Sequence, residues 1–83
     1  MIFQLALVNP TRDQEYINAF GNHLRELRKK HNLSQEQLAA NSKLAFSQIG
    51  RFERGERSPT LSTIKALADG LGVHPRELLD FTS

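Results

Sequence analysis

The residues best suited to binding chemistry lie close together, in residues 46–54, which read FSQIGRFER. If this stretch is a helix, 100° per residue places an apolar face between roughly 240° and 300° from Phe46. That face consists of Ala45, Ile49 and Phe52. A second face, between roughly 0° and 140°, combines an aromatic ring, a hydroxyl, a bare backbone and two guanidinium groups. It consists of Phe46, Ser47, Gly50, Arg51 and Arg54.

This second face carries groups that read DNA in the major groove. Arginine makes a bidentate contact to guanine, an aromatic side chain contacts the thymine methyl group, and a serine hydroxyl bonds a base or a phosphate. We therefore expect Arg51, Phe46 and Ser47 to read bases, with Phe46 folded into the core as the alternative. Glycine inside a helix costs about 0.5–1 kcal/mol relative to alanine. Gly50 thus indicates a close approach, either by nucleic acid or by another helix.

Five helical segments are expected to hold this face in place, which makes the fold class all-α. The first begins at a cap provided by Thr11 or Asp13 and runs to about Lys30. Its apolar stripe recurs every three to four residues, and its basic residues 25 and 28–30 lie off that stripe. Ser34, with Gln37 at the capping-box spacing, begins a second segment that ends within residues 41–43.

The remaining three segments follow from stop and start signals. The third covers residues 45–54 and stops at Gly55, which suits a left-handed position after a helix. Thr60 caps a fourth segment, and Gly72 ends it. Pro75 belongs in the first turn of a short fifth segment. The chain is thus divided into an apolar segment at residues 1–10 and one domain at residues 11–83, with residues 34–54 as its centre.

Basic residues concentrate in the middle of the chain. Residues 20–57 hold eight Lys or Arg against four Asp or Glu, whereas residues 58–83 hold two against three. This distribution indicates a directional basic face, although a solvated helix surface is the other interpretation. The backbone N–H groups at residues 34–36, beginning with Ser34, suit a phosphate. Further phosphate contacts are expected from Arg25, Lys43 and Arg57, while Arg54 is divided between a phosphate contact and a salt bridge.

The first eight residues, MIFQLALV, are apolar and end at Asn9-Pro10, a pair that favours a turn. They resemble a strand, but the chain has no second strand to pair with their backbone. One interpretation is an arm that contacts a second subunit, and the other is a frayed terminus. The expected dimer contacts are Ile2, Phe3, Leu5 and Leu7 in this segment, together with Leu78 and Phe81.

The central stretch resembles a known family. Gln35, Ala39, Ile49 and Phe52 stand where the helix-turn-helix of phage repressors has its initial glutamine, its packing alanine and its two core positions. The stretches RELRKKHNLSQEQLA, IGRFERGERSP and LGVHPRELL are similar to the XRE family of lambda-repressor-like domains. The resemblance covers about residues 20–81. It implies five helices, with the third in the major groove and Phe46, Ser47 and Arg51 at base-reading positions. It also implies that Gln35 braces against a phosphate or a base.

Two positions depart from that family. Lys43 stands where the family's turn usually has glycine, so either Lys43 takes up a strained positive φ or the turn differs. Ala45 stands where the family often has a Ser or Thr cap, whose loss costs about 1 kcal/mol. The resemblance also implies a structural role for Glu53.

Other classes of function are poorly supported by the sequence. The 83 residues make one small domain without cysteine, and the three histidines have no metal-ligand spacing on one helix face. No glycine-rich phosphate loop is present, so we expect neither an enzyme nor a cofactor. The longest apolar run is too short to span a membrane and lacks the features of a secretory signal, which indicates a cytoplasmic protein.

We therefore expect a sequence-specific transcription regulator that binds double-stranded operator DNA as a homodimer. Two copies on a near-palindromic site add affinity and specificity to a reading helix that covers few base pairs. Such a regulator either represses by occupying a promoter or activates by contacting RNA polymerase. The alternatives are an antitoxin that binds a toxin and regulates its own operon, and a controller of a restriction–modification operon.

Overall fold

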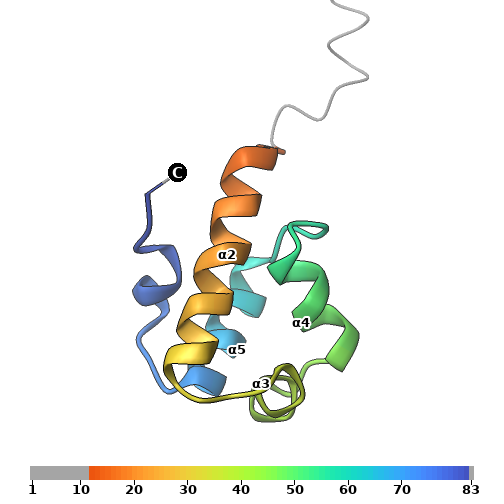
Figure 1. Ribbon diagram of the computed structural model, residues 1–83, viewed down its shortest axis with the longest axis vertical. Helices are drawn as coiled ribbons and strands as arrows, with labels where there is room; N and C mark the ends of the chain where they lie inside the picture. The colour runs from red at the N-terminus through yellow and green to blue at the C-terminus, as the bar shows by residue number, and fades with distance from the viewer. Residues whose placement is uncertain (1–11, 83) are drawn as a thin grey trace, which may run out of the picture.

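The computed structural model describes residues 12–82, in which five helical segments surround one core (Figure 1). They are α2 (Gln14–Lys30), α3 (Gln35–Ser42), α4 (Phe46–Glu53), α5 (Leu61–Leu71) and η1 (Pro75–Leu79). No strand occurs in this part of the chain, so the all-α prediction is confirmed. The fifth segment is a 3₁₀ helix rather than an α-helix, a form common in such short pieces. The expected N-terminal arm lies outside the described residues.

The helix starts are those that the capping residues predict. The Asp13 carboxylate accepts a hydrogen bond from the Tyr16 backbone N–H at 3.1 Å. Ser34 and Gln37 form a reciprocal capping box, with each side chain bonded to the other's backbone N–H at 3.0 and 2.8 Å. Thr60 accepts from the backbone N–H three residues later at 3.1 Å. Because these caps satisfy N–H groups that the helices leave free, the helices begin at defined residues.

The core is built from the apolar stripes of all five segments. α3 packs against α5, and α4 packs against α2 and α3, while η1 covers α5 and α2. Leu24, Leu38, Ile49, Leu67 and Leu78 are its largest fully buried side chains. The expectation that Leu78 contacts a second subunit is therefore wrong, because its side chain is fully buried in the core of this chain. Phe81 is half-buried, with its ring 5.0 Å from the ring of Tyr16.

Glycine brings α2 and α4 close together. A Cβ atom at Gly21 would lie 2.7 Å from the carbonyl oxygen of Glu53, closer than real side chains come to a backbone. This approach fixes α4 beside α2, which runs through the middle of the view in Figure 1, with α4 to its right. Within residues 12–82 no helix combines the length and the apolar character that a membrane crossing requires.

Candidate nucleic-acid interface

The turn between α3 and α4 is tight because Lys43 accepts a left-handed conformation. Its φ and ψ are 59° and 36°, and its backbone N–H bonds the carbonyl groups of Ala39 and Ala40. The next N–H, that of Leu44, also bonds the Ala39 carbonyl at 3.0 Å, and the Leu44 side chain packs against the core. Of the two possibilities expected at Lys43, a strained positive φ or a different turn, the structure shows the positive φ. The angle between the two helices is therefore fixed without glycine.

α4 begins without a side-chain cap, because Ala45 has no polar group to provide one. Half of a capping box remains, since the Gln48 side-chain oxygen accepts a hydrogen bond from the Ala45 backbone N–H at 3.0 Å. The Gln48 side chain is thereby turned back toward the start of the helix. It is half-buried, whereas its neighbour Ser47 is exposed.

The outer face of α4 displays most of the residues that the sequence placed there. Phe46 is 56% exposed, so its alternative as a core residue is wrong. Ser47 and Arg51 are also exposed, one helical turn apart on the same side. Ile49 and Phe52 are buried beneath them, as the helical periodicity predicts.

Gly50 differs from the expectation, because it is buried rather than open to a ligand. A Cβ atom there would lie 2.7 Å from the Nη1 atom of Arg54, whose side chain lies over the glycine. The close approach that the glycine permits is thus made by a side chain four residues along the chain. In this conformation the bare backbone of Gly50 is not presented to DNA.

Arg54 is engaged in an exposed ion pair. Its Nε donates to the Glu56 carboxylate at 2.6 Å and its Nη2 donates at 3.3 Å. These hydrogen bonds lower the pKa of Glu56 and raise the pKa of Arg54. Of the two roles expected for Arg54, the salt bridge is the one that the geometry shows.

A buried carboxylate ties α4 to the two helices beneath it. The Glu53 side chain is fully buried, and its oxygens accept from Arg28 Nε and Nη2 at 2.6 and 3.1 Å and from Gln35 Nε2 at 3.0 Å. Arg25 Nε lies 3.5 Å from the same carboxylate. Burial alone would raise the pKa of Glu53, but the hydrogen bonds from Arg28 and Gln35 and the charge of Arg28 bring it below its usual value. The network therefore holds the helices at one relative angle.

The sequence predicted only part of this network. A structural role for Glu53 was expected, but Arg28 was only placed off the apolar stripe of its helix, and its side chain is in fact buried, with 9% of the residue exposed. It also donates from Nη1 to the Leu33 carbonyl at 2.9 Å, and so reaches the start of α3 as well. A signal was present, since Arg25 and Arg28 stand one helical turn apart, but nothing in the sequence identified Glu53, which follows Arg28 by 25 residues, as their partner.

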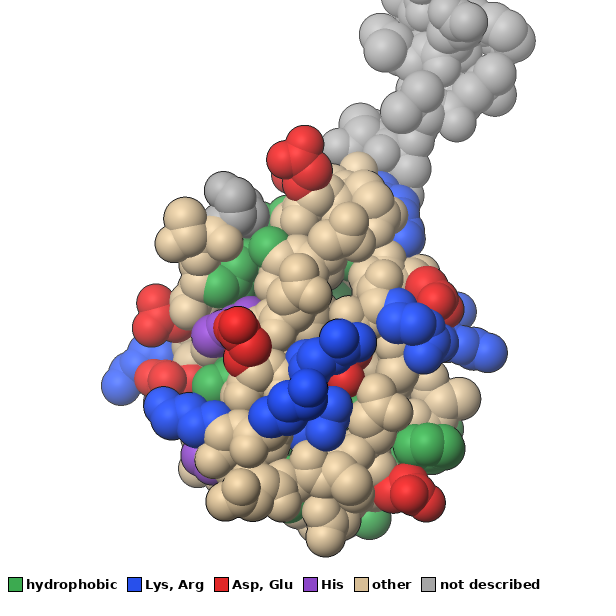
Figure 2. All heavy atoms as spheres, viewed as in Figure 1, with side chains coloured by type: hydrophobic (Ala, Val, Ile, Leu, Met, Phe, Trp, Pro, Cys, Tyr) green, Lys and Arg blue, Asp and Glu red, His purple; other side chains and the backbone are tan. Residues whose placement is uncertain are grey.

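Most of the expected phosphate-contact residues are open to solvent. Ser34, Lys43, Arg54, Arg57 and Arg25 are exposed, and Gln35 is half-buried. Lys and Arg side chains gather over the side of the molecule where α2 and α4 lie next to each other (Figure 2). Between them lies a polar hollow of about 360 Å³, lined by Asn18, Asn22, Arg25, Glu53 and Arg54. Of the expected phosphate-contact residues, Arg25 and Arg54 thus lie together beside the end of α4.

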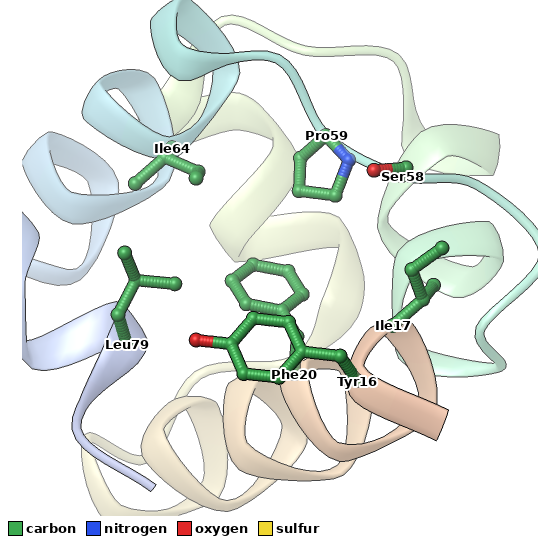
Figure 3. Close-up of a pocket in the computed structure, with 7 residues that line it drawn as sticks. All are labelled: Tyr16, Ile17, Phe20, Ser58, Pro59, Ile64 and Leu79. Carbon is green, nitrogen blue, oxygen red and sulfur yellow. The ribbon is translucent and has the colours of Figure 1, made fainter. Parts of the chain in front are cut away.

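An apolar groove of about 250 Å³ lies elsewhere on the domain (Figure 3). Its walls come from the first turns of α2, the loop before α5, α5 itself and the end of η1. The lining residues are Tyr16, Ile17, Phe20, Ser58, Pro59, Ile64 and Leu79. Tyr16 and Leu79 are each 44% exposed at its edge. The sequence did not indicate this groove, because its walls are separated along the chain.

Two short helices joined by a tight turn, the second with an exposed polar and aromatic face, define a helix-turn-helix domain. A family model described as helix-turn-helix matches residues 24–78. The chain belongs to this helix-turn-helix family, in its XRE-type branch of DNA-binding transcription regulators, and it is not an enzyme.

Several relatives carry a more specific name. The control protein C.BamHI of Bacillus amyloliquefaciens is 43% identical over 65 residues, covering 77% of this chain and 80% of that protein. The control protein C.SmaI of Serratia marcescens is 47% identical over 57 residues, covering 69% of this chain and 68% of that one. The crystal structure of the restriction–modification controller protein C.AhdI from Aeromonas hydrophila superimposes with a TM-score of 0.73 at 48% identity. That superposition covers 75% of this chain and 94% of the other.

Proposed function

We propose that this regulator binds a near-palindromic operator as a homodimer and controls the genes of a restriction–modification system. The observation that carries the proposal is the exposed face of α4, with Phe46, Ser47 and Arg51 projecting from a helix that the buried Glu53 network holds in place. The names of three similar proteins, at 43–48% identity, favour the restriction–modification setting.

Arg51 is the residue assigned to direct base reading by hydrogen bonds. It is exposed, and its fork of N–H donors matches the two acceptors on the major-groove edge of guanine. Ser34 and Gln35 stand at the start of α3, where the N–H groups of Gln35 and Glu36, which the Ser34–Gln37 capping box does not use, favour a phosphate. Lys43, Arg57 and Arg25 are assigned to the phosphate backbone on either side, where they position the domain without specifying sequence.

Dimerisation is assigned to the apolar groove, with a second copy of this chain as its occupant. The groove opens beside η1 and α5, and the exposed portions of Tyr16 and Leu79 form its edge. Two-fold symmetry suits a single self-complementary surface, because a palindromic operator presents the same half-site twice. The apolar residues Ile2, Phe3, Leu5 and Leu7 remain a second contribution to the same contact.

Selection of bound sites from random double-stranded DNA, with the full chain, tests this function. We expect two similar half-sites separated by about one helical turn of DNA, and a complex containing two protein chains. Arg51→Ala should weaken the selected site by about 1–3 kcal/mol and relax the preference at one base pair in each half-site. Arg76→Ala, which removes an exposed arginine from η1, is the matched control. A single unrepeated half-site or a one-chain complex would refute the homodimer, and an equal loss on all sequences would make Arg51 a phosphate contact.

A further inference from the structure

Phe46 is a large apolar side chain exposed on the reading face. Four large hydrophobic residues among residues 12–82 are exposed, and two of them, Tyr16 and Leu79, border the apolar groove. Phe46 instead begins α4, next to Ser47 and five residues before Arg51. The major groove displays one apolar group, the methyl at position 5 of thymine. In the major groove, a phenyl ring on a reading helix can therefore make an apolar contact only with this methyl group.

The neighbours of Phe46 strengthen this assignment. Ala45 contributes no polar group, and the Gln48 oxygen is occupied by the Ala45 N–H. A glutamine reads adenine with its oxygen and nitrogen together, so Gln48 in this arrangement is not available for that contact. The start of the reading helix is left with one phenyl ring and one hydroxyl. It has neither the amide nor the guanidinium group that reads a purine.

Because Ser47 carries a hydroxyl, Phe46 and Ser47 together do not distinguish the group at position 4 of a pyrimidine. Thymine presents an acceptor at position 4, whereas cytosine presents an N–H donor there. A serine hydroxyl both donates and accepts, so it satisfies either base. Discrimination at this position then depends on whether the pyrimidine carries a methyl group.

We propose that Phe46 and Ser47 form a reader of 5-methylpyrimidines, which accepts thymine and 5-methylcytosine alike and disfavours unmethylated cytosine. This inference rests on the operator binding proposed above. Operator affinity then depends on cytosine-5 methylation wherever this position of the half-site holds cytosine. Phe46 and Arg51 are five residues apart, or roughly 7.5 Å along the helix, which places the methylated pyrimidine about two base pairs from the guanine.

The test begins with the selected operator and replaces each thymine by uracil, which removes only the methyl group. Competition binding with the full chain should show one position in each half-site where uracil weakens binding about fourfold. With Phe46→Ala, the thymine and uracil operators should bind equally. At the same position, a site with 5-methylcytosine opposite guanine should bind the unaltered chain about fourfold more tightly than cytosine, and Phe46→Ala should remove that difference as well.

Lys65→Ala, on the exposed side of α5, is the control and should keep the thymine-to-uracil ratio of the unaltered chain. Circular dichroism should show an unchanged fold for Phe46→Ala, because the side chain lies outside the core. A uracil effect that persists in Phe46→Ala overturns the inference, as does a selected operator with no sensitive thymine. Failure to select any operator would instead refute the operator binding on which the inference depends.

Discussion

The guanidinium group of Arg28 and the carboxylate of Glu53 form a buried bidentate pair, with N–O distances of 2.6 and 3.1 Å. Arg28 belongs to α2 and Glu53 ends α4, the helix whose outer face carries Phe46, Ser47 and Arg51. Breaking a buried pair by removing one partner leaves an uncompensated charge in the interior. The orientation of the reading helix and the stability of the domain therefore depend on the same contact.

Arg28→Met should destabilise the domain by about 3–5 kcal/mol, because the Glu53 carboxylate is left buried without its main partner. Urea unfolding followed by circular dichroism measures the loss. Lys65→Ala removes one partner of an exposed pair with Asp69 and should cost less than about 1 kcal/mol. The double change Arg28→Met with Glu53→Leu should recover much of the lost stability, since apolar replacements of buried pairs are often neutral. Equal losses in Arg28→Met and Lys65→Ala would contradict a structural role for the pair.

The same carboxylate should make stability depend on pH on the acidic side. The pKa of Glu53 in the folded protein lies below its ordinary value of 4.5, so folding favours the ionised form. Its contribution is fully present above the unfolded pKa and is lost as the pH falls through the folded pKa. Unfolding free energies measured from pH 7 to pH 3 should decline at the acidic end, and Glu53→Gln should flatten this decline. An identical acid slope in both proteins would show that other carboxylates cause it.

The sequence was sufficient for features that depend on neighbouring residues. Helical periodicity placed Ile49 and Phe52 inward, and the capping patterns at Ser34 and Thr60 marked helix starts. Both signals are local, since they depend on residues within one or two helical turns. A structural role for Glu53 came from the family resemblance.

Features that join distant parts of the chain were missed. The sequence could not show that Arg28 is buried against a carboxylate 25 residues away, or that residues near positions 16, 59 and 79 line one groove. Gly50 shows a different limitation, because its position on the helix was predicted but the covering side chain of Arg54 was not. Helical periodicity predicts on which face of the helix a residue lies. Which group covers or contacts that residue depends on the rotamers of the neighbouring side chains.

Lys43→Gly should separate stability from DNA binding at the turn. Lys43 has φ of 59°, a region that costs non-glycine residues about 1 kcal/mol or more, so glycine should raise the unfolding free energy by up to about 1 kcal/mol. Removing the charge should at the same time weaken binding to all DNA sequences and reduce the salt slope by about one unit. Thermal unfolding and binding at several salt concentrations measure the two effects. Lys43→Val, which adds a branched side chain to the same φ, should destabilise the domain instead.

Ser42→Ala should stabilise the domain by about 1 kcal/mol. Among the described residues, the Ser42 hydroxyl is buried without a hydrogen-bond partner, in the close contact between α3 and Gly70 of α5. Removing an unsatisfied hydroxyl recovers its desolvation cost and leaves little empty volume. Gly70→Ala is the opposite change at the same contact. Its Cβ would lie 3.0 Å from the Ser42 backbone nitrogen, and it should destabilise by about 1–3 kcal/mol. A loss of stability in Ser42→Ala, measured by urea unfolding, would show that the hydroxyl has a partner after all.

Ala45→Ser should add the missing side-chain cap to α4. Ala45 already has the extended conformation of a capping residue, with φ of −69° and ψ of 143°, so a serine hydroxyl can accept from the Gln48 backbone N–H without rearrangement. The expected gain is about 1 kcal/mol in unfolding free energy, measured by urea denaturation. The Gln48 side chain already satisfies the Ala45 N–H, and the Gln48 N–H already bonds the Ala45 carbonyl at 3.0 Å, so the serine hydroxyl would complete the box by sharing that N–H. Ala45→Val, which adds volume without a hydroxyl, should give no such gain; an equal gain from both would attribute the effect to packing instead of capping.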